Sequence, residues 1–307
     1  MSFQLYSQSE KRDLPPIQLN PKINDPNLYI PSKGLVNAVN VALALGQPLL
    51  LTGEPGTGKT RLAFHIAHIF NLGKPLIFNA QTTSTMKDLF YRYDALGHFQ
   101  FCQTNQTLLG KEDVEARFIR YQGLGQAIKE KQRAVVLIDE IDKAPRDLPN
   151  DVLAALEDLA FTVTETGKSY RSAPDNRPII IMTSNSEKNL PDAFLRRVTY
   201  YHIPFPDRAT LLKILQSKSS RSSDMDLEAV IKHFELIRKG RKAKLKKNPA
   251  TAELIYWAQL LGKLGIDTSK LAKIDQLSAD DKEKLAISYS VLAKNKEDLE
   301  ALKKLVK

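Results

Sequence analysis

With 307 residues, 42% of them hydrophobic and 26% charged, the chain has the composition of a globular protein with room for about two domains of ~150 residues. The net charge is +10, and residues 208–307 carry 22 basic and 13 acidic side chains, against 23 and 22 before them. A single cysteine, Cys102, excludes an internal disulfide framework and fits a reducing cytoplasm. No apolar run follows the first charges and the longest apolar stretch is interrupted, so we expect no signal peptide, no membrane association and a cytoplasmic location.

The first half of the chain predicts an arm followed by a parallel sheet. Residues 1–30 are polar and rich in Pro and Asn, which is typical of an irregular N-terminal arm. A helix is expected after Pro31, where apolar residues recur at helical spacing: Leu35, Val36, Val39 and Leu43. Four apolar runs predict buried strands, within 49–51, 75–83, 134–145 and 178–182. Helical patterns alternate with these runs, which indicates a parallel sheet covered on both faces.

Two segments between the strands have patterns of their own. Residues 86–110 have no clean period and predict a helix with an insertion. Residues 161–171 alternate apolar and polar side chains around a Thr-Gly turn, which predicts a β-hairpin.

After Pro206 every pattern is helical. One apolar stripe runs through Leu227, Val230, Ile231, Phe234 and Ile237. A helix is expected from Asn248–Pro249 to Gly265, and a last helical region from Ser278. The chain therefore predicts an α/β domain followed by a smaller all-helical one.

The stretch GEPGTGKT matches the phosphate-binding pattern G-x-x-x-x-G-K-[ST] between a predicted strand and a predicted helix. Its glycines let backbone N–H groups turn toward phosphate oxygens, and the helix points its positive end at the same anion. Lys59 is expected to reach the β- and γ-phosphates of ATP, and Thr60 to offer its hydroxyl to Mg²⁺. The predicted cofactor-binding residues here are Gly53, Glu54, Pro55, Gly56, Thr57, Gly58, Lys59, Thr60 and Arg61.

The third apolar run ends in two acids about 80 residues later, in VVLIDEID. Asp139 is expected at the tip of the strand, where it would bind ATP-bound Mg²⁺ through the metal's water shell together with Thr60. Glu140 follows directly and is positioned to polarise the attacking water. Acids at a strand end are also common helix N-caps, so the distance from the phosphate loop is what favours the catalytic interpretation.

The fourth run ends in TSN, which places Asn185 at the tip of the next strand. Asn185 is expected to hold the attacking water from the other side; a turn or cap is the plain structural alternative. Asn79, on the second strand, is a candidate to restrain Glu140 when no partner is bound, or equally a satisfied buried amide.

These motifs, in the order GEPGTGKT, LIDEIDKAP, TSN and LPDAFLRR followed by IPFPD, resemble an AAA+ ATPase of the MoxR group. The resemblance runs from about Leu28 to Ala209. It implies a nucleotide domain over 31–206 with an insertion in its second helix, a hairpin before the fourth motif, and a helical lid over 207–307. It also implies a homo-oligomeric ring, a hexamer in this family, and ATP-driven remodelling of protein clients, among them proteins with a von Willebrand factor A domain.

The resemblance gives the adjacent Arg196 and Arg197 a role. In similar proteins an arginine at the end of the helix carrying LRR acts as a finger on the γ-phosphate of the neighbouring subunit. A planar guanidinium suits the oxygens of the transferring phosphoryl group, and such a finger contributes roughly 10³–10⁵ in rate. The sequence leaves open which of the two arginines acts, or whether both only pair with acids.

The chain departs from the family at the lid. Related ATPases offer another arginine near the start of a helix opening with Pro, but no arginine follows Pro249 here. Lys247 is a candidate substitute, although the ammonium group of a lysine cannot donate the pair of parallel hydrogen bonds that an arginine guanidinium makes to a phosphate. The departure leaves nucleotide binding intact and favours a further alternative, a slow nucleotide-gated switch.

A second alternative is a nucleic-acid motor or loader, because residues 238–247 hold seven basic side chains. The stretch has no aromatic residue to stack a base, so we prefer a solvated face or a site for an acidic partner. His65 and His68 lie one turn apart, but no further metal ligand is evident in the sequence.

Overall fold

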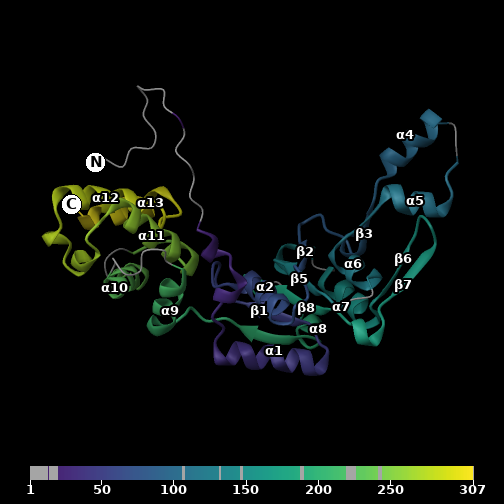
Figure 1. Ribbon diagram of the computed structural model, residues 1–307, viewed down its shortest axis with the longest axis horizontal. Helices are drawn as coiled ribbons and strands as arrows, with labels where there is room; N and C mark the ends of the chain where they lie inside the picture. The colour runs from purple at the N-terminus through teal and green to yellow at the C-terminus, as the bar shows by residue number, and fades with distance from the viewer. Residues whose placement is uncertain are drawn as a thin grey trace. The chain divides into compact units, whose positions relative to one another are not determined.

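The computed structural model describes residues 13, 20–105, 108–130, 133–145, 148–186, 190–218, 226–240 and 244–306. Their contacts divide them into two compact units, both drawn in Figure 1. The α/β unit comprises residues 31–54 and 59–204. The helical unit comprises residues 55–58, everything described from Phe205 onward, and the described residues before Pro31.

A five-stranded parallel sheet forms the centre of the α/β unit, in the order β2-β5-β8-β1-β9. The strands are β1 (Leu49–Thr52), β2 (Leu76–Asn79), β5 (Val135–Asp139), β8 (Ile179–Thr183) and β9 (Thr199–His202). β1, β5 and β8 are almost wholly buried, as their uniformly apolar sequences require. The four predicted strands and the predicted parallel α/β fold are therefore confirmed, and β9 is an additional edge strand.

Helices cover this sheet, as the ribbon in Figure 1 shows. The α/β unit contains α1 (Lys33–Leu45), α2 (Lys59–Ile69), α3 (Lys87–Phe90), α4 (Ala95–Asn105), α5 (Lys111–Phe118), α6 (Gly123–Lys129), α7 (Leu148–Asp158) and α8 (Asp192–Leu195). Of these, α4 lies away from the sheet and buries no side chain. α1 starts after the N-cap Ser32 and stops at Gly46, whose left-handed backbone (φ 62°) suits glycine. One apolar core gathers side chains from β1, β2, β5, β8 and the covering helices.

The segment 86–110 is more varied than a helix with an insertion. It holds α3, the strand β3 (Tyr91–Tyr93) and α4, and β3 pairs antiparallel with β4 (Ile119–Tyr121). The predicted hairpin is confirmed as β6 (Ala160–Val163) and β7 (Lys168–Arg171), paired antiparallel.

A buried carboxylate links these two small sheets. Glu115 on α5 accepts hydrogen bonds from the hydroxyls of Tyr121 (2.5 Å) and Tyr170, and pairs with Lys168 at 3.1 Å and Lys129 at 3.6 Å. Burial raises the pKa of the Glu115 carboxyl, but the hydrogen bonds from Tyr121, Tyr170 and Lys168 outweigh it and lower the pKa to about 2. Side chains from α5, β4, β7 and α6 therefore meet at one ionised group.

The helical unit has its own core. Its helices are α9 (Arg208–Lys218), α10 (Leu227–Arg238), α11 (Thr251–Leu264), α12 (Ala279–Ser288) and α13 (Lys296–Lys303), with short 3-10 turns at Pro21–Ile23 and Pro26–Leu28. The predicted stripe on α10 is wholly buried. The expected helix start at Pro249 is wrong by two residues: α11 begins at Thr251, because the Glu253 carboxylate accepts the Ala250 N–H at 3.0 Å and fixes Ala250 as the N-cap.

Among the residues that the structure describes, no helix has both the length and the apolar character needed to cross a lipid bilayer.

Candidate functional site

The predicted phosphate loop follows β1 and leads into α2. Gly56 and Gly58 have φ angles of 77° and 92°, which only glycine adopts without strain. The two glycines therefore explain the local path of the loop.

Lys59 is buried at the start of α2 and donates three hydrogen bonds. They reach the carbonyl oxygens of Gly53 (2.7 Å) and Glu54 (3.1 Å) and the side-chain oxygen of Asn185 (2.9 Å). Burial lowers the pKa of the Lys59 ammonium group, and the carboxylates of Asp139 and Asp142 oppose that shift. The ammonium is thus held at the carboxyl edge of the sheet, next to the end of β8.

Asp139 ends β5 and lies against two hydroxyls. Thr60 donates to Asp139 Oδ1 at 3.0 Å, and the buried Thr183 donates to the same oxygen at 2.5 Å. Hydroxyl and carboxylate oxygens are the hard donors that Mg²⁺ prefers, and Mg²⁺ in nucleotide sites takes its remaining ligands from phosphate and water. Thr60 and Asp139 therefore fit the role of the two protein groups on a nucleotide-bound Mg²⁺.

Glu140 is held by its neighbours on several sides. Its backbone is left-handed (φ 56°, ψ 48°), and its N–H donates to Thr183 Oγ1 at 2.9 Å. Its carboxylate accepts from the Asn185 amide at 3.2 Å and pairs with Lys143 at 2.5 Å. Asn79 is exposed at the end of β2, so its interpretation as a buried amide is wrong, and the Glu140 carboxylate contacts Asn185 and Lys143 where Asn79 was the other candidate.

The two arginines differ in their surroundings. Both follow α8 and are exposed, but Arg197 pairs with Glu157 on α7 at 3.7 Å. Within the described part of the chain, the Arg196 side chain has no hydrogen bond or ion pair. Arg61, predicted as a nucleotide-binding residue, stacks over the ring of Phe64 at 5.6 Å.

The structure thus brings Lys59, Thr60, Asp139, Glu140 and Asn185 together within the α/β unit. Such a cluster offers a cation for phosphate oxygens, two oxygens for a metal, and a carboxylate beside an amide that together orient a water. Thr183 and Lys143 were not predicted from the sequence. Both lie inside motifs already singled out there: Thr183 begins TSN, and Lys143 ends DEIDK.

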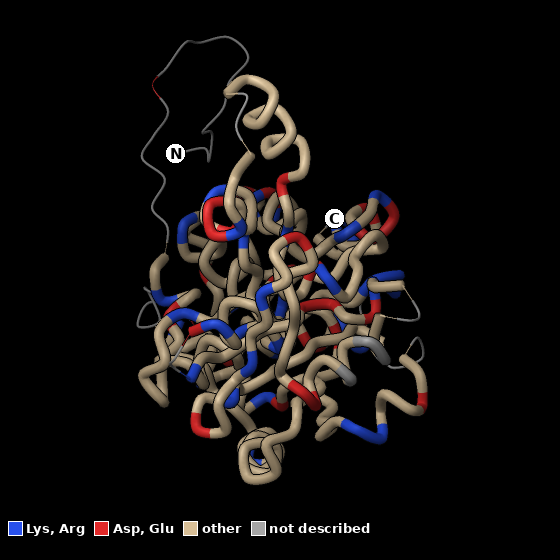
Figure 2. The backbone as a smooth tube through the Cα atoms, turned by 90° about the vertical axis from the view of Figure 1, so that its right-hand side faces the viewer, with Lys and Arg blue, Asp and Glu red and all other residues tan. Residues whose placement is uncertain are grey.

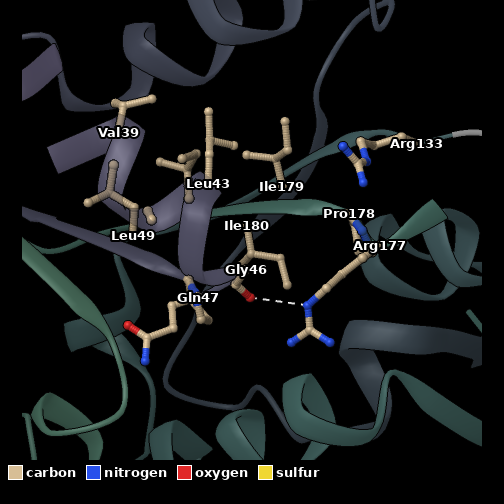
Figure 3. A pocket seen from close by; sticks show the side chains of 13 residues that line it. Val39, Leu43, Gly46, Gln47, Leu49, Arg133, Arg177, Pro178, Ile179 and Ile180 are labelled. Carbon is tan, nitrogen blue, oxygen red and sulfur yellow. Dashed lines mark hydrogen bonds between the residues drawn. The ribbon is translucent and has the colours of Figure 1, made fainter. Parts of the chain in front are cut away.

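A different hollow lies at the opposite edge of the sheet, near the starts of β1 and β8 (Figure 3). Its walls are apolar side chains such as Val39 and Leu43 of α1, with Arg133 and Arg177 at its rim. Arg177 donates to the carbonyl oxygens of Gly46 (3.1 Å) and Leu156 (3.2 Å), so it caps two helices. This hollow lies at the amino ends of the strands, apart from the cluster above.

The two histidines and the basic stretch 238–247 are the remaining candidates from the sequence. Among the described residues, no group of three or more His, Cys, Asp or Glu side chains is placed to hold a metal, which leaves His65 and His68 without co-ligands. Part of the basic stretch 238–247 is already paired: Arg238 lies 3.7 Å over the Phe205 ring, Lys239 pairs with Glu235, and Lys246 with Glu297. Residues 241–243 of that stretch lie outside the described residues.

Comparisons with known proteins agree with the geometry. Residues 48–198, from the start of β1 to just past the arginine pair, match the family described as "AAA domain (dynein-related subfamily)". Protein NorQ of Paracoccus denitrificans is 26% identical over 265 residues, which cover 84% of this chain and 90% of NorQ. The gas vesicle ATPase GvpN1 of Halobacterium salinarum is 25% identical over 207 residues, or 64% of this chain and 58% of GvpN1.

Among solved structures, NtrX from Brucella abortus in complex with ADP matches 82% of this chain and 56% of its own, at 17% identity and a TM-score of 0.44. The family match covers the phosphate loop, both acids at the end of β5 and Asn185, and the sequence relatives extend over most of the chain. Residues 48–198 therefore carry an AAA domain, which supports nucleotide binding and ATP hydrolysis by this protein, and the chain is similar to NorQ and to the gas vesicle ATPase GvpN1.

Proposed function

We propose that this protein assembles into a homo-oligomeric ring, a hexamer, and uses ATP hydrolysis to remodel or mature a partner protein in the cytoplasm. In this proposal residues 31–206 are the nucleotide domain and residues 207–307 the lid. Glu140 and Asn185 orient the attacking water, Thr60 and Asp139 hold Mg²⁺, and the residues from Gly53 to Arg61 bind the nucleotide. The observation that carries it is the cluster of Lys59, Asp139, Glu140 and Asn185 at the carboxyl edge of the sheet.

An arginine supplied by a neighbour completes the proposed site. Arg196 is the better candidate, because a finger must be able to reach a second subunit, and Arg197 is already paired with Glu157. That ion pair is exposed and contributes little to stability, but it directs the Arg197 side chain toward α7 of its own subunit. The arrangement therefore favours Arg196 as the group that acts on the γ-phosphate in trans.

A surface in the α/β unit supports a protein as the partner. Helix α4 carries no Lys, Arg, Asp or Glu along its eleven residues and contains no buried side chain. Leu96 and Phe99 on it are 66% and 59% exposed, and in Figure 2 it is the unbroken tan helix at the top of the tube. Exposed apolar groups on an uncharged helix are typical of contacts with proteins, whereas nucleic acid calls for basic groups.

The family resemblance adds a class of client, proteins with a von Willebrand factor A domain. The nucleic-acid alternative is weakened by the partners of Arg238, Lys239 and Lys246, which already engage the chain itself. The slow-switch alternative keeps one favourable observation, the absence of an arginine after Pro249 in the lid.

The test is ATP turnover per subunit measured against protein concentration. The full chain is compared with Arg196→Ala and Arg197→Ala, and Glu140→Gln serves as the blank. We expect the specific activity of the parent to rise with concentration, since each site needs a neighbour. Arg196→Ala is expected to stay flat while still binding ATP, and Arg197→Ala to follow the parent.

A constant activity per subunit, with both arginine variants matching the parent, would contradict the ring and favour the slow switch. Stimulation of turnover by DNA or RNA, with binding that falls steeply as salt rises, would favour the nucleic-acid alternative instead.

A further inference from the structure

Thr183, the last residue of β8, is 1% exposed although its side chain carries a hydroxyl. Burying a hydroxyl is unfavourable unless it is hydrogen-bonded, so its partners show what the position is for. The hydroxyl donates to Asp139 Oδ1 at 2.5 Å and accepts from the Glu140 N–H at 2.9 Å. One buried oxygen therefore bonds both acids at the end of β5.

The peptide that Thr183 holds has an uncommon conformation. Glu140 is one of three non-glycine residues with positive φ in the described part of the chain. Such a backbone persists only where its surroundings fix it. The Glu140 N–H bonds to Thr183, and the Glu140 carbonyl accepts from the Lys143 N–H at 2.9 Å, so this residue is fixed on both sides. The direction in which the Glu140 carboxylate leaves the backbone depends on these two bonds.

The orientation of Asp139 depends on the same hydroxyl. Its Oδ1 atom accepts from Thr183 on β8 and from Thr60 on α2, at 2.5 and 3.0 Å. β5 and β8 run parallel, with Ile138 opposite Met182, so the next residue of each strand meets the other at the sheet edge. Two donors from different elements leave the carboxylate little freedom to rotate.

We propose that Thr183 is a positioning residue for ATP hydrolysis, whose hydroxyl sets the Asp139 carboxylate and the Glu140 backbone in one mutual geometry. The inference rests on the roles proposed above for these two acids. The hydrogen-bond partners of the Thr183 hydroxyl do not include Lys59 or the phosphate loop. Loss of the hydroxyl is therefore expected to slow the chemical step and leave nucleotide binding in place.

The experiment compares Thr183→Val, which keeps the shape and removes the hydroxyl, with Thr183→Ser, which keeps the hydroxyl. Thr268→Val is the matched control, since Thr268 is 3% exposed and its hydroxyl accepts the Asp226 N–H at 2.8 Å in the helical unit. Each full-length variant is assayed for kcat and KM with MgATP, for the Mg²⁺ concentration that gives half-maximal turnover, for the Kd of a fluorescent ADP analogue, and for its melting temperature.

We expect Thr183→Val to lower kcat by about 10- to 100-fold and to raise the Mg²⁺ requirement by about 10-fold, the usual effect of losing a partner of a metal ligand. The Kd for the ADP analogue is expected to stay within about 2-fold, and Thr183→Ser to recover kcat to within about 3-fold of the parent. Thr268→Val is expected to lose thermal stability and keep its kcat.

The inference is overturned if Thr183→Val is folded and keeps the parental kcat. It is equally overturned if Thr183→Ser loses as much activity as Thr183→Val, since the methyl group and not the hydroxyl would then matter. Glu140→Gln, run alongside, separates this from the proposed function. If that variant keeps the parental turnover, the role of Glu140 fails and the inference fails with it.

Discussion

The side-chain oxygen of Asn185 lies 2.9 Å from the ammonium of Lys59, so a side-chain hydrogen bond joins the end of β8 to the start of α2. The amide nitrogen of the same Asn185 donates to Glu140. Since an amide has a donor end and an acceptor end, its orientation is fixed by the cation on one side and the carboxylate on the other. Asn185 therefore connects Lys59, proposed to bind phosphate, with Glu140, proposed to orient the attacking water.

Asn185→Ala removes this connection. We expect kcat for ATP hydrolysis to fall by about 10- to 100-fold, or about 1.4–2.7 kcal/mol, because Glu140 and the attacking water lose an oriented partner. KM is expected to change much less. The measurement is steady-state turnover of the full chain, with Asn40→Ala, an exposed position on α1, as the control. An Asn185→Ala enzyme with parental kcat would show that the amide only caps the strand end.

Mixing variants tests whether Arg196 acts across subunits. Arg196→Ala keeps its own Glu140, and Glu140→Gln keeps its own arginine, so each can supply what the other lacks. In randomly mixed rings at equal amounts, about one quarter of the sites combine an intact Glu140 with a neighbour's intact Arg196, and we expect about that fraction of parental turnover. If the mixture shows only the sum of the activities that the two variants have when assayed alone, Arg196 does not act on the site of a neighbouring subunit.

The Glu115 cluster predicts a pH dependence of stability. Because the carboxyl pKa is lowered to about 2 in the folded protein from an ordinary 4.5, its contribution is complete above about pH 4.5 and is lost as the pH falls toward 2. Glu115→Gln is expected to be less stable than the parent at pH 7 by roughly 1–3 kcal/mol. That difference should shrink as the pH drops from 5 to 3.

Urea unfolding of both proteins across this pH range is the measurement. Glu112→Gln, an exposed position on the same helix, is the control and is expected to track the parent throughout. A difference between Glu115→Gln and the parent that is independent of pH would assign the loss to packing and not to charge.

Gly125 on α6 predicts a steric effect on stability. A Cβ added there would lie 2.6 Å from the carbonyl carbon of Phe90, and closer still to its oxygen. Backbone has to move to make room, so Gly125→Ala is expected to destabilise the α/β unit by about 1–3 kcal/mol or more. The melting temperature of the full chain reports this, and Gly110→Ala, where the nearest atom is 3.7 Å away, is the matched control. Equal melting temperatures for the two variants would contradict the close approach.

The sequence predicted the buried strands best, and it picked out candidate residues that the structure brings together, because both depend on strong local patterns. β1, β5 and β8 are uniformly apolar and end in polar motifs, so their type, direction and tips could be inferred together. β9 was missed because its four residues TYYH are only partly buried and come soon after α8 and the arginine pair. Only pairing with β1 makes this segment a strand, and pairing is a property of the whole sheet.

The fine geometry of the site was beyond a sequence argument for a similar reason. The left-handed backbone of Glu140 and the double hydrogen bond of Thr183 arise where two strands end side by side. Neither residue type signals such a conformation alone, since glutamate disfavours it. The difference between Arg196 and Arg197 likewise depends on where α7 places Glu157.

The edge strand β9 connects the arginine pair with the strand that precedes the phosphate loop. Arg196 lies just before β9, and β9 pairs along its whole length with β1, the strand that leads into the phosphate loop. At one end of the ladder the Thr199 N–H donates to the Pro48 carbonyl at 2.9 Å. At the other end the Ile203 N–H donates to the Thr52 carbonyl at 2.8 Å. In the proposed ring, the strand that leads into a subunit's own phosphate loop is therefore hydrogen-bonded to the strand that follows the arginine offered to the next subunit. A change in the position of β1 would then have to be accommodated by β9 and by the segment that carries the arginine pair.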